Sequence, residues 1–140
     1  MFTDILPKGK MDQYNKSIEE LENVYWPDSS FNSYVVQTSQ NARKKPISQL
    51  SYEEIRLLIG QKVGLQYLIP IALSIISKDP LIKVYFYEGD LLFQLLRLSE
   101  DDWKNNKEDL KYFKIIVNEN LPLIKSCDEI SHDLIEKYLN

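Results

Sequence analysis

Helix-starting signals placed directly before stripes of apolar residues constrain this chain more than any other feature. Ser51 followed by Glu54 is the pattern of a capping box, in which each side chain accepts a hydrogen bond from the other residue's backbone amide. Tyr52, Ile55 and Leu58 follow at steps of three. Because an α-helix turns once every 3.6 residues, this spacing places them on one face. The pattern predicts a helix that begins at Ser51 and buries one side.

Similar stripes recur along the chain and predict six or seven helices. The expected helical stretches are Met11 to Tyr25, Phe31 to Ala42, Tyr52 to Gly60 or Gly64, Leu65 to Ser77, Asp90 to Leu98, Trp103 to Val117 and Asp128 to Tyr138, with Pro122 as a restart. Their expected caps are Asp12, Ser51, Asp90, Ser99 with Asp102, and Asp128.

Three stretches leave an alternative open. Tyr34 to Val36 has strand propensity when taken alone, and Lys83 to Tyr87 is short, aromatic and β-branched enough to be extended. Pro70 either kinks its helix or marks its first turn.

With only four glycines in 140 residues, a loop-rich β fold is disfavoured. We therefore predict an all-α fold, a single-domain irregular bundle of helices over residues 1–140.

The charge balance disfavours some partners and favours others. The chain has 17 basic and 21 acidic residues, a net charge of −4, and residues 101–140 hold nine of the acids against six bases. Binding of nucleic acid through phosphates needs a basic surface, so none is expected, whereas a basic protein partner suits this balance.

The longest apolar run, Tyr67 to Ile76, is about half of a membrane span. With one cysteine and no apolar leader near Met1, we predict a cytoplasmic protein that does not bind membranes.

The residues that could carry chemistry form no catalytic pattern. His132 is the only histidine and Cys127 the only cysteine, so they cannot supply a zinc site, and five residues apart they suit a nucleophile and base poorly. Paired acids such as Glu53 with Glu54 fall at predicted helix starts, where the helix dipole favours negative charge. We expect no metal, no cofactor and no enzymatic activity.

The segment from Arg43 to Leu98 resembles the immunity proteins of contact-dependent growth inhibition (CDI) systems. The residues that carry the resemblance are Arg43, Lys45-Pro46, Leu50, Ser51, Arg56, Leu58-Ile59-Gly60-Gln61, Gly64-Leu65, Tyr67-Leu68, Pro70, Ala72-Leu73, Asp79-Pro80, Tyr87 and Gly89-Asp90-Leu91-Leu92. The segment covers somewhat over a third of the chain. The resemblance implies a small cytoplasmic protein that binds the C-terminal toxin domain of a cognate effector one to one and blocks it. Such toxins are commonly nucleases, whose active sites are basic.

The residues that carry the resemblance are mostly apolar, glycine or proline and are expected to be scaffold. The toxin-binding residues are instead predicted among the acids Glu88, Asp90, Asp101, Asp102, Asp128, Glu129, Asp133 and Glu136. Tyr85, Tyr87 and Trp103 are candidate aromatic anchors, with a core position as the alternative for each. A competing surface contains Glu19, Glu20, Glu22 and Asp28.

Two other functions stay open at this point. A helical adaptor or regulatory module with a different protein partner would share the fold and lack the toxin. An enzyme that uses carboxylates would need one of the paired acids, or Asp90, to act on a substrate. The neighbouring gene distinguishes an adaptor from an immunity protein, because an immunity gene should lie directly behind the gene of a large secreted effector.

Overall fold

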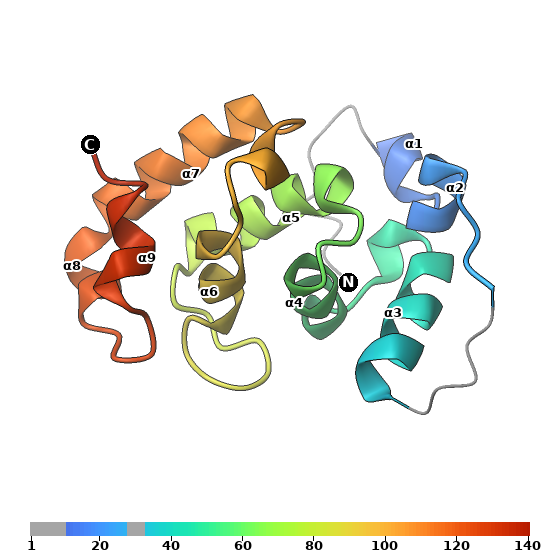
Figure 1. The fold of residues 1–140 in the computed structure, drawn as a ribbon, viewed down its shortest axis with the longest axis horizontal. Coiled ribbons are helices and arrows are strands. Elements are labelled where there is room, and N and C mark those ends of the chain that lie inside the picture. The colour runs from blue at the N-terminus through green and yellow to red at the C-terminus, as the bar shows by residue number, and fades with distance from the viewer. Residues whose placement is uncertain (1–10, 28–32) are drawn as a thin grey trace. The chain divides into compact units, whose positions relative to one another are not determined.

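The computed structural model describes residues 11–27 and 33–140 (Figure 1). Within them the protein is 63% helical, with nine α-helices and no strand, so the predicted all-α irregular bundle is confirmed. Its contacts divide into two compact units, one ending at Ile71 and the other running from Ala72 to Asn140. We describe each unit by itself. The single domain over residues 1–140 stays a prediction.

The N-terminal unit contains five helices, the last of which continues past its end. They are α1 (Met11–Tyr14), α2 (Ile18–Glu22), α3 (Tyr34–Lys44), α4 (Tyr52–Gly60) and α5 (Leu65–Lys78), with a 3₁₀ turn, η2 (Ile47–Gln49), between α3 and α4. The stretch Tyr34 to Val36 is therefore helical and not extended. Ser33 caps α3, and the predicted start at Phe31 lies outside the described residues. Pro70 lies inside α5 beyond its first turn.

The single helix predicted from Met11 to Tyr25 is wrong, because Ser17 breaks it. The Ser17 hydroxyl accepts a hydrogen bond from the Glu20 amide, and the Glu20 carboxylate accepts one from the Ser17 amide, both at 3.1 Å. This capping box starts α2 afresh. Ser17 also forms a bridge with Pro46, and the amide of Ile47 donates to the carbonyl of Lys16 at 3.0 Å. The break thus lets η2 hydrogen-bond to the chain between α1 and α2.

The capping box predicted at Ser51 is present, but the end of α4 differs from expectation. The amide of Ser51 donates to Glu54 at 2.9 Å, and the amide of Glu54 donates to Ser51 at 3.1 Å. The left-handed residue after α4 is Lys62, with φ of 60°, and not a glycine. The amides of Lys62 and Val63 donate back to the carbonyls of Ile59 and Leu58, both at 2.9 Å, which is a Schellman motif.

Gly64 is left-handed as well, with φ of 65°, and it serves close packing next to α2. A Cβ atom at this position would stand 2.7 Å from the Cδ1 atom of Ile18, a buried side chain. The start of α5 therefore requires a residue without a side chain, both for its backbone angle and for its contact.

Arg43 is buried at the C-terminal end of α3. Its guanidinium donates to the Glu22 carboxylate at 3.0 Å and to the carbonyl of Val24 at 2.8 Å, and it lies 4.1 Å from the centre of the Trp26 ring. The sequence indicated only a charge that suits a helix end. In the structure, Arg43 also ties the segment after α2 to α3 by charge-assisted hydrogen bonds and a cation–π contact.

The C-terminal unit begins within α5 and contains α6 (Asp90–Leu96), the 3₁₀ turn η3 (Asp101–Trp103), α7 (Lys107–Glu119), α8 (Leu121–Lys125) and α9 (His132–Glu136). Two predicted caps are wrong. Gly89, with φ of 84°, takes the N-cap position of α6, and Ser131 in place of Asp128 caps α9. Ser99 and Asp102 do make the predicted reciprocal pair of bonds, at 2.8 and 3.2 Å.

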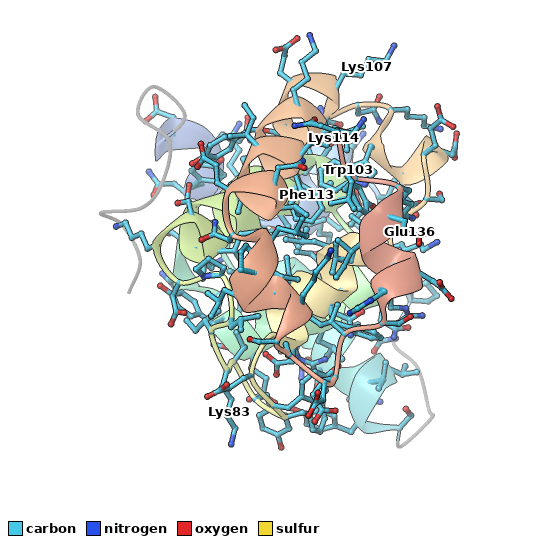
Figure 2. All side chains as sticks on the ribbon, turned by 90° about the vertical axis from the view of Figure 1, so that its left-hand side faces the viewer. Lys83, Trp103, Lys107, Phe113, Lys114 and Glu136 are labelled. Atoms are coloured by element: carbon cyan, nitrogen blue, oxygen red, sulfur yellow. The ribbon has the colours of Figure 1, made fainter. Side chains whose placement is uncertain are left out.

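Three aromatic rings form the centre of this unit's core (Figure 2). Trp103 stacks on Phe113 with 5.2 Å between ring centres, and Tyr138 meets Phe113 edge-on at 5.0 Å. The indole nitrogen of Trp103 donates to the Tyr138 hydroxyl at 3.3 Å. That hydroxyl donates in turn to the backbone carbonyl of Leu98, which follows α6, at 3.1 Å. The cluster therefore fixes the C-terminal segment against η3 and α7.

Candidate functional site

A short loop between α5 and α6 exposes two neighbouring aromatic side chains. Tyr85 is 49% exposed and Phe86 is 60% exposed, and their rings touch edge to face with 4.6 Å between centres. The residues from Lys83 to Glu88, here called the aromatic loop, form no strand beyond one isolated bridge that joins the two ends of the loop. The structure therefore turns a stretch that could have been extended into a closed loop with an apolar tip.

Asp90 holds the aromatic loop from inside. Its carboxylate accepts hydrogen bonds from three consecutive backbone amides, those of Val84, Tyr85 and Phe86, at 2.9, 2.9 and 2.8 Å. Burial of the carboxylate raises the pKa of Asp90, but these amide hydrogen bonds together lower it by more, so the pKa lies below its usual value. Asp90 is only 1% exposed. Asp90 is therefore a buried support of the loop and not a surface acid.

The base of the aromatic loop packs on the segment before α9. A Cβ atom at Gly89 would stand 3.2 Å from Leu81 and 3.2 Å from Ile130, so both neighbours pack tightly against this glycine. The Cys127 thiol donates to the carbonyl of Glu88 at 3.5 Å. These contacts bring the exposed acid Glu88 close to the exposed acids Asp128 and Glu129, which follow Cys127 in the chain.

The remaining predicted acids lie on two other elements of the C-terminal unit. Asp101 and Asp102 lie in η3, and Asp133 and Glu136 lie in α9. The Lys137 ammonium donates to the Leu98 carbonyl at 2.8 Å, which ties the end of α9 to the chain just before η3. Figure 2 shows Glu136 well apart from Lys83, the first residue of the aromatic loop. The predicted acids are thus spread over several elements of the C-terminal unit, and Asp90 is buried.

The predicted aromatic anchors have three different environments. Trp103 is buried in the core, so it offers no surface to a partner. Tyr87 is half-buried, with its ring 6.3 Å from that of Phe93. Tyr85 is exposed, and its neighbour Phe86, which the sequence reasoning missed, is more exposed still. The signal for Phe86 was available, because three consecutive aromatics outside a regular helix cannot all point inward.

The competing surface in the N-terminal unit has fewer free acids than its sequence indicated. Glu20 is engaged in the capping box of α2, and Glu22 is paired with Arg43. Glu19 is half-buried, and Asp28 lies outside the described residues. Several exposed apolar side chains follow α2, namely Val24, Tyr25 and Trp26. Two of the described acids there are thus committed to internal contacts.

The side chains that could bind a metal or act as a nucleophile are scattered or engaged. In the ranges that the structure describes, no group of three or more His, Cys, Asp or Glu residues could hold a metal ion. His132 is exposed at the start of α9, while the Cys127 thiol contacts the Glu88 carbonyl. A groove of about 560 Å³ beside Trp103 is lined by Glu100, Asp101, Lys104 and Lys107 among others. Its two acids and two lysines balance, so its charge indicates no particular ligand.

The fold and this site together define an all-α protein that exposes aromatic and acidic side chains on the aromatic loop and on the segment before α9. The chain belongs to the CDI immunity proteins, whose family model matches residues 20–113. No curated protein and no solved structure matches it. The resemblance predicted from Arg43 to Leu98 is therefore confirmed.

Membership of the family supports a toxin-neutralising immunity protein, from a family that is in general non-enzymatic. The match includes the whole aromatic loop and Asp90, whereas Asp128, Glu129, Asp133 and Glu136 lie beyond its end. Among the described residues, no helix combines the length and the apolar character that crossing a bilayer would require.

Proposed function

We propose that this protein neutralises the C-terminal toxin domain of a cognate CDI effector by binding it one to one, and that the toxin is a basic nuclease. The observation that carries the proposal is the family match over residues 20–113. The charge of the chain supports the nature of the partner. A nuclease holds phosphates with basic side chains, and a protein with a net charge of −4 is attracted to such a surface.

The acids proposed to face the toxin are those that remain at the surface. They are Glu88, Asp101, Asp102, Asp128, Glu129, Asp133 and Glu136, of which Asp102 is half-buried and the others are exposed. Because they lie on several elements of the C-terminal unit, some of them can contact the toxin while others contribute long-range attraction.

Co-expression with the toxin domain encoded next to this gene tests the proposed function. Cells that make both proteins should grow, and cells that make the toxin domain alone should die. Purification of the pair should yield a complex with one copy of each chain. If the cells die as fast with this protein as without it, the proposal is wrong for that pair. A partner other than a toxin at the neighbouring locus would favour a helical adaptor.

Salt should slow the association of the two proteins. Long-range attraction between opposite charges is screened beyond roughly 8–10 Å at physiological ionic strength, so the association rate constant should fall as sodium chloride rises. The dissociation rate constant should change much less, because it depends on contacts made at short range. Stopped-flow mixing at several salt concentrations measures both. An association rate that stays flat would argue against recognition through the acids.

A further inference from the structure

The tip of the aromatic loop offers a partner an exposed apolar contact surface. We propose that Tyr85 and Phe86 anchor this protein in an apolar pocket of the toxin domain, bordered by lysine or arginine side chains, and that Asp90 holds them in the binding conformation. This inference rests on the proposed function and adds to it the contact that supplies most of the affinity.

The exposure of the two rings is the first observation. Tyr85 and Phe86 place adjacent aromatic surfaces in water at the tip of one loop, an arrangement that water does not favour. A few large side chains, prominently tyrosine and other aromatics, dominate the energetics of protein interfaces. Two rings that already touch each other can enter one pocket together.

Hydrogen bonds from Asp90 and Gly89 restrain the backbone of the loop. A six-residue loop without regular structure would ordinarily lose conformational freedom on binding, and that loss would weaken the complex. Here the Asp90 carboxylate binds the amides of both Tyr85 and Phe86. The amide of Gly89 donates to the carbonyls of Leu81 at 3.1 Å and Ile82 at 3.3 Å, which closes the base. The rings are therefore presented on a backbone that is largely ordered before the partner arrives.

The charges around the aromatic loop favour a basic protein as the partner that binds there. Around the loop and the segment beneath it, the acids Glu88, Asp128 and Glu129 are exposed, and the bases are Lys83 and Lys125, the last residue of α8. Figure 2 shows Lys83 at the opposite end of the view from Lys107 on α7, so the α7 lysine does not offset these acids. Arginine or lysine at the rim of the toxin pocket could pair with the acids and lie over the aromatic faces. An anionic membrane surface would instead be repelled.

Replacement of both anchors, set against a matched pair elsewhere, tests the proposal. The double variant Tyr85→Ser with Phe86→Ser removes the rings, and the control Tyr112→Ser with Ile115→Ser removes comparable apolar surface from α7, where these residues are 45% and 52% exposed. Affinity for the toxin domain, measured by calorimetry, should fall by about 100-fold or more in the loop variant. The control should stay within about threefold. Circular dichroism and urea unfolding check that both variants fold.

The kinetics distinguish the anchors from the acids. Loss of the rings should act mainly by raising the dissociation rate constant, whereas Glu88→Gln with Glu129→Gln should lower the association rate constant and its salt dependence. If the loop variant folds and binds the toxin domain as tightly as the wild type, the inference is wrong while the proposed function stands. If the wild-type protein neither binds nor protects, the proposed function itself fails. A loop variant that only abolishes self-association, seen by sedimentation, would assign the loop to a second copy and overturn the inference.

Discussion

Replacing Trp103 with alanine should lower the free energy of unfolding by about 3–5 kcal/mol, the range typical of removing a buried tryptophan. The indole is buried between Phe113 and Tyr138, and its nitrogen donates to the Tyr138 hydroxyl. Its removal leaves a cavity, ends the ring stacking and takes away one hydrogen bond of a buried hydroxyl. Urea unfolding followed by circular dichroism measures the change.

Tyr112→Ala is the matched control for Trp103→Ala. Tyr112 is an aromatic residue on α7, one position before Phe113, but its side chain is exposed. Surface substitutions away from special contacts usually change stability by no more than about 0.5 kcal/mol. A Trp103→Ala protein that loses less than about 1 kcal/mol would contradict the aromatic cluster as the centre of the core of the C-terminal unit.

Replacing Asp90 with alanine should cost about 2–4 kcal/mol, because it leaves three backbone amides without their acceptor. The cost stays below that of three full charged hydrogen bonds, because the tip of the loop is exposed and water can hydrate some of these amides. Asp90→Asn should lie between alanine and the wild type, since its amide oxygen keeps one acceptor site and its charge is lost. Hydrogen exchange at Tyr85 and Phe86 should speed up in both variants.

The stabilisation by Asp90 should depend on pH in a defined direction. The pKa of Asp90 is lowered in the folded protein, so its contribution is fully present above the unfolded value of about 3.9. It is lost as the pH falls through the lower folded value, where the carboxylate takes up a proton. The difference in stability between the wild type and Asp90→Asn should therefore shrink below about pH 4. Asp101→Asn removes one exposed carboxylate from η3 and serves as the matched control for the loss of a negative charge.

The sequence was most informative where a side chain acts on its own helix. The Ser51 and Glu54 pattern predicted the start of α4, because a capping box is a bond between residues three apart. Ser17 and Glu20 show the same pattern. The apolar stripe from Met11 to Tyr25 runs across it, however, and predicts one helix where the structure has α1 and α2. The end of α4 was not predicted, because the left-handed residue there is Lys62, and a lysine is not the clear sequence signal for this conformation that a glycine is.

The candidate site was predicted in part, and the missing part was the role of each residue. Glu88, Asp128 and Glu129 were expected at the surface and lie there, close to one another through a contact between Cys127 and Glu88. The sequence predicts Asp90 as the cap of the apolar helix that follows it, and as a surface acid beside Glu88. Whether its carboxylate turns toward solvent or toward the amides of Val84 to Phe86 depends on how the loop closes, and a sequence does not record that.

The all-α class and the membership of the CDI immunity proteins could be read from the chain alone, since helix periodicity, capping patterns and the resemblance are properties of residues near one another in sequence. Tertiary structure decided which acids are free, which rings are buried and that Tyr85 and Phe86 share an exposed tip. The physical reason is that exposure and hydrogen-bond partners depend on residues distant along the chain, such as Ile130 beneath Gly89 and Tyr138 against Trp103.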